Sequence, residues 1–478
     1  MNSMIPRVPI RPLIWPDTIL ELAEQLTDSD QPIYIVGGAV RDAYFGLPLH
    51  DCDLVTPVGA AALARRIANL LKGDVYVMDA ERDVARVLAD TPAGRLSLDV
   101  AAYRASDLLT DLTERDFTFN AMAVDLRAPE LLIDPLDGET DLKHKLIRRC
   151  TDHAIAHDPI RALRAVRQSV QMRAHIEKMT MHDIRANAGR LYETSPERVR
   201  DELVKILATQ RPHAALRVMI SLGLLQPILP EVAALPEDDL LSAVRTVEHV
   251  SSILTVISPG RTDNTASAFG LGAMVVAMDK FRPRLQSHIG LIWPTDRPHR
   301  AILQLMALVL AVKDAGGMVN VTDYADRLVA HLRLSNAERV RLLAVLRADL
   351  SIISADDPLN ALAQHRFWHV LDVAGVDVVL LGLAQYLTQA GMNLQHKRWV
   401  RVLERARTLL DAFYMRHDEI VAPPPVIDGT QLMAALSLKP GPVIRELLDL
   451  VREGQVTGEI TDRESALAST REYLRSKP

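Results

Sequence analysis

Cysteine and aromatic residues are scarce in this chain of 478 residues. Its two cysteines, Cys52 and Cys150, are too few for a disulfide framework and fit no zinc-binding motif, which is typical of a reducing compartment. Aromatic residues make up only 4% of the chain, so an extensive platform for stacking nucleic-acid bases is not expected. The sequence therefore argues against a secreted disulfide scaffold and against a structural zinc domain.

Long apolar runs are also missing. No run approaches the roughly 18 apolar residues that a membrane-spanning helix needs. The beginning of the chain, MNSMIPRVPIRPLIWPD, has prolines where a signal peptide has an uninterrupted apolar core. With 48% hydrophobic and 24% charged residues, the composition is ordinary for a globular protein of about two to four domains. We expect a soluble, cytoplasmic protein without a membrane partner, and the sequence leaves its protein partners unknown.

Charge is unevenly distributed. The chain carries a net charge of −6, yet the segment Asp141–Arg217 holds sixteen Lys and Arg against nine Asp and Glu. A local excess of positive charge is what contact with a phosphate backbone requires. A series of solvated helix faces would give the same count, so charge alone leaves both interpretations open.

The order of sequence patterns predicts an α+β fold. Five short β-rich runs indicate strands in the first 150 residues, namely IYIVGG, DVYVMDA, VARVLA, LSLDVAAY and AMAVDL. Apolar spacing predicts a helix over Val58–Leu71. After about Cys150 the strands stop, and DPIRALRAVRQSVQM and SPERVRDELVKIL are helical, the latter with Ser195 as N-cap and Pro196 at its first position. We expect a head with a mixed sheet (1–150), then an elongated all-α neck (151–225), body (226–420) and tail (421–478).

The stretch IYIVGGAVRDAYFGLPLHDCDLVTP carries the first candidate site. Gly37 and Gly38 allow a sharp turn after a strand and leave backbone N–H groups open to an anion. Arg41 lies close behind them, and a guanidinium suits phosphate. On a strand, Asp51 and Asp53 point to the same face, where a pair of carboxylates suits Mg²⁺ shared with substrate phosphates. An ordinary glycine turn followed by a solvated acidic loop is the alternative.

Asp99 is the candidate third carboxylate. It is a charge within the otherwise apolar strand LSLDVAAY, and two-metal phosphoryl transfer commonly uses such a residue. The alternative is an aspartate on an edge strand that faces water.

Five segments together resemble one family. GGAVRDAYFGLPLHDCDLVT resembles the head motif of the class II tRNA nucleotidyltransferases, which share it with bacterial poly(A) polymerases. The resemblance continues in order through DLTERDFTFNAMAVDL, LIDPLDGETDLKHKLIR, HDPIRALRAVR and SPERVRDELVKIL, over about 175 residues. It implies a polymerase-β-like nucleotidyltransferase head with a base-selecting helix in the neck, and an enzyme that adds CCA, or part of it, to tRNA from CTP and ATP with Mg²⁺.

The resemblance also assigns roles to individual residues. Asp51 and Asp53 would hold the Mg²⁺, and Asp158 with Arg161 would select the base, sharing one helix face at an interval of three. The remaining positions would contact the nucleotide or order its site: Gly37, Gly38, Arg41, Arg115, Asn120, Arg164 and Arg167. Without the head motifs, the arginines of the neck would be read as an exposed, salt-bridged helix face.

This sequence departs from the family pattern at three positions. Glu114 replaces the first arginine of the family's Arg-Arg-Asp, His157 replaces a glutamate, and Gln168 stands where an aromatic residue often follows. Each lies beside a retained position, so we expect tuned rather than abolished chemistry, and the sequence does not decide the nucleotide preference.

The helical remainder gives weaker signals. Many bacterial relatives carry an HD phosphohydrolase domain, but Lys313-Asp314 stands where its His-Asp doublet would be, so we expect a degenerate region without that activity. The segment Pro423–Leu467 resembles the tail of bacterial CCA-adding enzymes, which implies tRNA binding. A poly(A) polymerase and a catalytically silent RNA-binding relative are the alternative functions.

Overall fold

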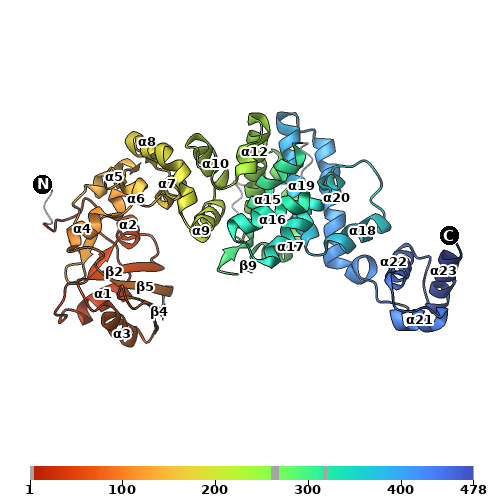
Figure 1. Ribbon diagram of the computed structural model, residues 1–478, viewed down its shortest axis with the longest axis horizontal. Helices are drawn as coiled ribbons and strands as arrows, with labels where there is room; N and C mark the ends of the chain where they lie inside the picture. Colours follow the sequence, from red (N-terminus) through yellow and green to blue (C-terminus); the bar gives the residue numbers. More distant parts are fainter. Residues whose placement is uncertain (1–4, 260–268, 316–319, 477–478) are drawn as a thin grey trace. The chain divides into compact units, whose positions relative to one another are not determined.

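The computed structural model describes residues 5–259, 269–315 and 320–476. The chain forms two compact units, each described here by itself. The first comprises the residues up to Glu202 together with Val218–Pro227, and the second comprises Leu203–Arg217 and the residues from Ile228 onward. Figure 1 shows that strands concentrate in the N-terminal part, coloured red to orange, while helices make up nearly all of the rest.

A six-stranded mixed sheet forms the centre of the first unit, as the sequence predicts. The strand order is β3-β4-β5-β2-β1-β6, in which β2 and β5 run parallel and all other neighbours are antiparallel. The strands are β1 (Tyr34–Val36), β2 (Asp51–Thr56), β3 (Asp74–Asp79), β4 (Val84–Thr91), β5 (Gly94–Ala102) and β6 (Ala123–Asp125). The five expected strands are confirmed, and Asp51 and Asp53 do lie on a strand.

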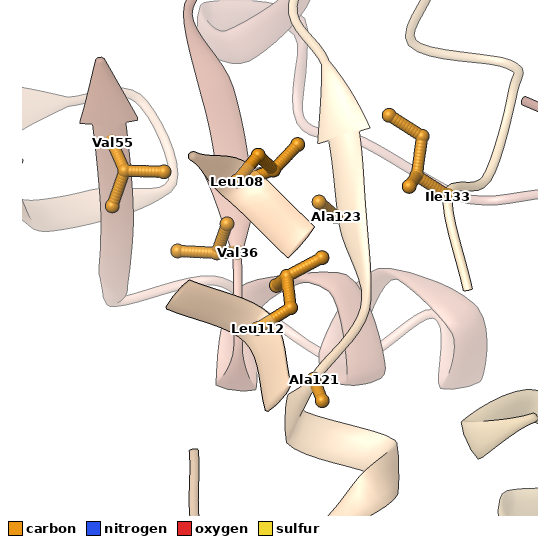
Figure 2. Packing of buried hydrophobic residues seen from close by; sticks show 7 residues of the cluster. All are labelled: Val36, Val55, Leu108, Leu112, Ala121, Ala123 and Ile133. Carbon is orange, nitrogen blue, oxygen red and sulfur yellow. The ribbon is translucent and has the colours of Figure 1, made fainter. Parts of the chain in front are cut away.

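The two faces of the sheet differ because side chains alternate along each strand. Helix α3 (Ala60–Leu71), predicted over Val58–Leu71, packs on the face where Ala85, Val87 and Leu98 are buried. On the opposite face, α4 (Leu108–Thr113) covers only one part. Its leucines pack with apolar residues of β1, β2, β6 and the segments on either side of β6. Figure 2 shows this cluster, which consists of Val36, Val55, Leu108, Leu112, Ala121, Ala123 and Ile133. The rest of this face, around Asp51 and Asp53, is accessible.

Further helices complete the first unit and lead into the second. They are α1 (Asp17–Gln25), α2 (Gly38–Phe45), η1 (Thr118–Asn120), α5 (Gly138–His144), α6 (Ala154–His157), α7 (Ile160–Met172), α8 (Lys178–Asn187), η2 (Ala188–Glu193), α9 (Pro196–Leu207) and α10 (Pro212–Ser221). The expected start of α9 is confirmed, since the Arg198 N–H donates to Ser195 Oγ at 3.4 Å. The expectation that strands end near Cys150 is not fully correct: β7 (Leu146–Ile147) pairs in parallel with β8 (His175–Ile176).

The second unit is almost entirely helical. Besides the hairpin of β9 (Ile292–Trp293) and β10 (Arg297–Pro298), it contains α11 (Pro230–Ala233), α12 (Glu237–Ile257), α13 (Phe269–Met278), η4 (Asp279–Phe281), α14 (Arg282–Ile289), α15 (His299–Asp314), α16 (Val321–Leu332), α17 (Asn336–Arg347), η5 (Leu350–Ile353), α18 (Ala361–Leu371), α19 (Ala374–Ala390), η6 (Gly391–Asn393), α20 (His396–Met415), η7 (His417–Val421), α21 (Gly429–Leu436), α22 (Pro442–Thr457) and α23 (Arg463–Ser476).

One of these helices bears on the expectation about membranes. By length and composition, α12 could cross a membrane, contrary to the expectation from apolar runs, and α18 with α19 would pass the same test as one bent pair. Half of the apolar stretch of α12 is buried, and this helix packs against α15 and α19. A helix of this kind is typical of the core of a helical domain.

Candidate active site

The glycine turn brings a carboxylate and a guanidinium together. Gly37 joins β1 to α2 with φ 75° and ψ −132°, a conformation that favours glycine. A Cβ at this position would lie 3.0 Å from Arg115 Nη1 and 3.4 Å from Asp53 Oδ2. The turn therefore needs glycine both for its backbone and for the space that Arg115 and Asp53 occupy.

The register of the sheet places the carboxylates on one face. Asp53 of β2 is paired with Asp99 of β5, and Asp51 is paired with Ser97. Although Asp53 is accessible to water, the surrounding protein raises its pKa. Partial burial is the largest cause; the charges of Arg115 and Arg104 oppose it, and Asp99 and Asp51 add to it. A divalent cation between Asp51 and Asp53 would relieve this repulsion, so these residues fit the Mg²⁺ that the sequence predicts.

Asp99 is not on an edge strand, because β5 lies between β4 and β2. Both of its oxygens accept hydrogen bonds from Arg86 of β4, from Nε at 2.6 Å and from Nη2 at 2.8 Å. Among the described residues, one group has three metal-binding side chains whose ligand atoms all lie within 4.8 Å of one another, and it lies in the second unit. The ligand atoms of Asp51, Asp53 and Asp99 are therefore not all this close together. Its role as a third metal ligand stays a prediction.

The other residues expected to contact nucleotide form a connected set. Arg41 Nη1 donates to Asn120 Oδ1 at 3.2 Å, and Asn120 Nδ2 donates to Asp116 Oδ1 at 2.9 Å. Arg115 pairs with Asp111 at 3.2 Å. Gly38 begins α2, where backbone N–H groups lack helical partners. The structure thus gathers the cations of the predicted site around the glycine turn and fixes their orientations.

Of the two residues expected to select the base, Arg161 contacts this set and Asp158 contacts another helix of the neck. Arg161 of α7 donates from Nη1 to the carbonyl of Arg115 at 3.0 Å and from Nη2 to the carbonyl of Glu114 at 2.7 Å. Asp158 pairs with Arg198 of α9 at 2.8 Å. The expectation that Asp158 and Arg161 share a helix face is wrong, because Asp158 has extended dihedral angles and precedes α7. Their role in base selection stays a prediction.

The next arginines of the neck have protein partners. Arg164 lies 2.9 Å from the buried Asp116, and Arg167 lies 2.8 Å from Glu202. Burial raises the pKa of Asp116, but the charge of Arg164 and hydrogen bonds from Asn120 and the Phe117 N–H outweigh burial, so the pKa is lowered. Arg164 thereby ties the neck helix to the head. Phosphate contacts by Arg164 and Arg167 stay predictions.

Sequence reasoning missed two arginines at this site. Arg104, just after β5, is exposed, and its charge lowers the pKa of Asp53. Arg86 is half-buried on the same face as Asp99. The alternation of VARVLA could have shown that Arg86 faces away from the core, but its partner depends on the pairing of β4 with β5.

A second cluster with metal-binding side chains lies in the second unit. His288 and His299 each place Nε2 next to Asp377 Oδ1, at 2.7 and 2.9 Å, and all three residues are buried. However, the Trp293 indole N–H donates to His299 Nδ1 at 3.0 Å, so the ring proton sits on Nε2 and points at Asp377. A metal at Nε2 would move that proton to Nδ1, facing the indole donor. Arg341 lies 2.8 Å from Asp377 Oδ2 and already supplies positive charge.

This cluster is therefore a hydrogen-bonded core contact rather than a metal site. Burial raises the pKa of Asp377, but the interactions with His299 and His288 outweigh burial, so the pKa is lowered. At the expected position of the HD doublet, Lys313 donates to the Ala348 carbonyl at 2.6 Å and Asp314 accepts from Gln385 at 2.6 Å. The absence of HD phosphohydrolase activity stays a prediction.

Two family models and several curated relatives match the chain. The family model "Poly A polymerase head domain" matches residues 33–148, and "Probable RNA and SrmB-binding site of polymerase A" matches residues 175–235. A CC-adding tRNA nucleotidyltransferase of Geobacter sulfurreducens is 30% identical over 93% of this chain and 91% of its own length. An A-adding tRNA nucleotidyltransferase of Deinococcus radiodurans is 29% identical over 93% and 96%.

Solved structures share the fold. A CCA-adding enzyme in complex with ATP has a TM-score of 0.67 and 21% identity, covering 96% of this chain and 95% of that one. The Thermotoga maritima CCA-adding enzyme in complex with tRNA has a TM-score of 0.60 and 20% identity, with coverage of 96% and 95%. The polymerase-β-like head and the mostly helical remainder are thus confirmed. From the extent of the Geobacter match, the chain belongs to the tRNA nucleotidyltransferase family.

Proposed function

We propose that this protein transfers CMP, AMP or both from CTP and ATP to the 3′ end of tRNA, building all or part of the CCA terminus and releasing pyrophosphate. The convergence of Asp53 and Arg115 on the Gly37 turn carries the proposal, because it places a metal-binding carboxylate beside a phosphate-binding cation. The full-length relatives named for CC and A addition support tRNA as the acceptor.

The chain's own residues suit this chemistry. Asp51 and Asp53 would hold Mg²⁺, which activates the attacking hydroxyl and offsets charge on the leaving oxygen. Arg41 and Arg115 bind and orient the triphosphate, and Asn120 keeps Arg41 in place through its 3.2 Å hydrogen bond. The terminal ribose hydroxyl then attacks the α-phosphate in line and pyrophosphate leaves. For this step the protein has to position the reactants, and it forms no covalent bond with them.

Nucleotide choice is assigned to the junction of head and neck. Arg161 is fastened to the carbonyls of Glu114 and Arg115, so a base recognised by Arg161 and Asp158 would be held at a fixed distance from the triphosphate. Carboxylate and guanidinium together match the donor and acceptor edges of cytosine and adenine. We place the reaction in the cytoplasm, in line with two free cysteines, Cys52 and Cys150.

The test is incorporation of labelled CTP and ATP, with Mg²⁺, into three tRNA preparations that lack the last three, two or one nucleotides. CMP on the first two supports CC addition, AMP on the third alone supports A addition, and growth to CCA on all three supports both. The match to the family model of the poly(A) polymerase head favours one alternative function, a poly(A) polymerase. Unlimited AMP addition to an RNA that is not tRNA would establish that alternative, and no incorporation into any RNA would refute both.

A further inference from the structure

A row of four side chains crosses the open face of the sheet. Asp53 of β2 is paired with Asp99 of β5, Asp99 with Arg86 of β4, and Arg86 with Tyr76 of β3. Residues paired in this way point to the same face. The Asp53–Tyr76 row therefore leads from the metal-binding carboxylate to the edge of the sheet, over three strand spacings or about 14 Å.

The outer half of this row is accessible. Tyr76 is 50% exposed, and the side chain of Arg86 is 41% exposed. The opposite face of β4 and β5 is the one that α3 covers, where Ala85, Val87 and Leu98 are buried. The register thus places an exposed aromatic ring beside a partly exposed guanidinium.

Arg86 keeps hydrogen-bonding capacity. Its Nε and Nη2 donate to the two oxygens of Asp99, which holds the guanidinium plane against β5. Among the described residues, none accepts a hydrogen bond from Arg86 Nη1. An arginine fixed on one edge by a carboxylate can present its other edge to a phosphate.

The position of the row indicates what would bind there. The elements assigned to the nucleotide, namely the Gly37 turn, α2 and η1, follow or adjoin β1 and β6 on one side of β2. The row extends from β2 in the other direction, through β5, β4 and β3. In-line transfer requires the attacking and leaving oxygens on opposite sides of the α-phosphate. With the triphosphate over β1, an RNA end that arrives over β5 satisfies this requirement.

We propose that Arg86 and Tyr76 bind the last nucleotides of the acceptor RNA, Arg86 through a phosphate and Tyr76 by stacking on a base. The inference rests on the proposed function, because it needs an RNA 3′ end at Asp53. Aromatic stacking suits this task since every base has a π-face, so the surface can accept successive termini as the RNA grows. Asp99 is then a positioning residue for Arg86.

The discriminating variant is Tyr76→Ala, which leaves Arg86 and Asp99 intact. We expect its KM for tRNA lacking the CCA end to rise about tenfold or more, while the Kd for CTP measured without RNA is unchanged. Tyr76→Phe keeps the ring and should restore the wild-type KM. Arg82→Ala serves as the matched control for charge, because Arg82 lies in the turn between β3 and β4 with a side chain 84% exposed and outside the row.

Arg86 is tested through salt. In Arg86→Ala, tRNA binding should lose one phosphate contact to a single strand. The plot of log K against log salt should then be less steep, its negative slope smaller in magnitude by about 0.7. Arg82→Ala should keep the wild-type slope. Equal slopes in Arg86→Ala and the wild type would overturn the phosphate contact.

Failure of this inference is distinct from failure of the proposed function. If the wild-type protein adds nucleotides to tRNA but Tyr76→Ala has an unchanged KM for tRNA, the RNA-end site is wrong and the function stands. If the wild-type protein adds no nucleotide to any RNA, the function fails first. A parallel rise of the CTP Kd in Tyr76→Ala would also contradict the inference, since it would place Tyr76 on the nucleotide side.

Discussion

Gly37→Ala offers a sharp test of the site geometry. The new Cβ would lie 3.0 Å from Arg115 Nη1 and 3.4 Å from Asp53 Oδ2, and the backbone has φ 75° and ψ −132°. Holding alanine in such a conformation costs about 1–3 kcal/mol. In addition, the Arg115 guanidinium has to move by a few tenths of an ångström, away from the position in which we propose that it binds a triphosphate.

The same substitution at Gly59 separates these two effects. Gly59 also has a positive φ, 77°, but a Cβ there has no neighbour within 4 Å. Thermal melting should show a lowered Tm in both variants. Only Gly37→Ala should raise the KM for CTP or ATP, and we expect a rise of tenfold or more, equivalent to about 1.4 kcal/mol.

The assay is steady-state incorporation into tRNA with nucleotide varied at saturating RNA. Arg115→Ala provides the reference for complete loss of this cation. If Gly37→Ala has the nucleotide KM of the wild type, Arg115 does not need the space above the turn, and the proposed link between turn and nucleotide binding is refuted. If the KM rises equally in Gly59→Ala, backbone strain rather than displacement of Arg115 causes the rise.

Three further predictions concern the carboxylates and the neck. Asp53→Asn should abolish incorporation, retain tRNA binding and melt at the same or a higher temperature than the wild type. The raised folded-state pKa means that the ionised carboxyl costs stability at neutral pH, a cost relieved as the pH falls through that pKa; a clearly lower Tm would contradict this. Asp377→Asn should lower stability by about 3–5 kcal/mol by leaving Arg341 buried without its charge partner, and this loss should be the same with and without EDTA. Because the pKa of Asp377 is lowered, its contribution is present above pH 4 and is lost as the pH falls toward the folded pKa. Arg161→Ala should alter the ratio of CMP to AMP incorporation more than it alters Tm, and an unchanged ratio would remove Arg161 from base selection.

Local patterns in the sequence predicted the glycine turn and the carboxylate pair of the head well. A glycine turn after a strand and two carboxylates at an interval of two are consequences of backbone geometry over a few residues. Gly37 and the pair Asp51 and Asp53 therefore appear in the structure as expected. The start of α9 at Pro196, behind the Ser195 cap, depends equally on local chemistry.

Contacts between distant residues were not predictable in this way. The Arg86–Asp99 pair follows from the register of β4 with β5, which the sequence does not state. His288 and His299 meet Asp377 across 89 and 78 residues, so no spacing could have shown the cluster. Asp158 was expected on the helix of Arg161, but the proline after Asp158 disfavours a helical conformation for the residue before it.

Addition of a defined terminus to tRNA by the wild-type protein is tested most directly by intact mass. Three tRNA preparations, lacking the last three, two or one nucleotides, are weighed after incubation with the protein, CTP, ATP and Mg²⁺. We expect at least one preparation to gain CMP, AMP or both and to end at or before CCA, and we expect no change with Asp53→Asn. An unchanged mass of all three preparations with the wild-type protein, or a ladder of AMP additions without an end, would contradict this expectation.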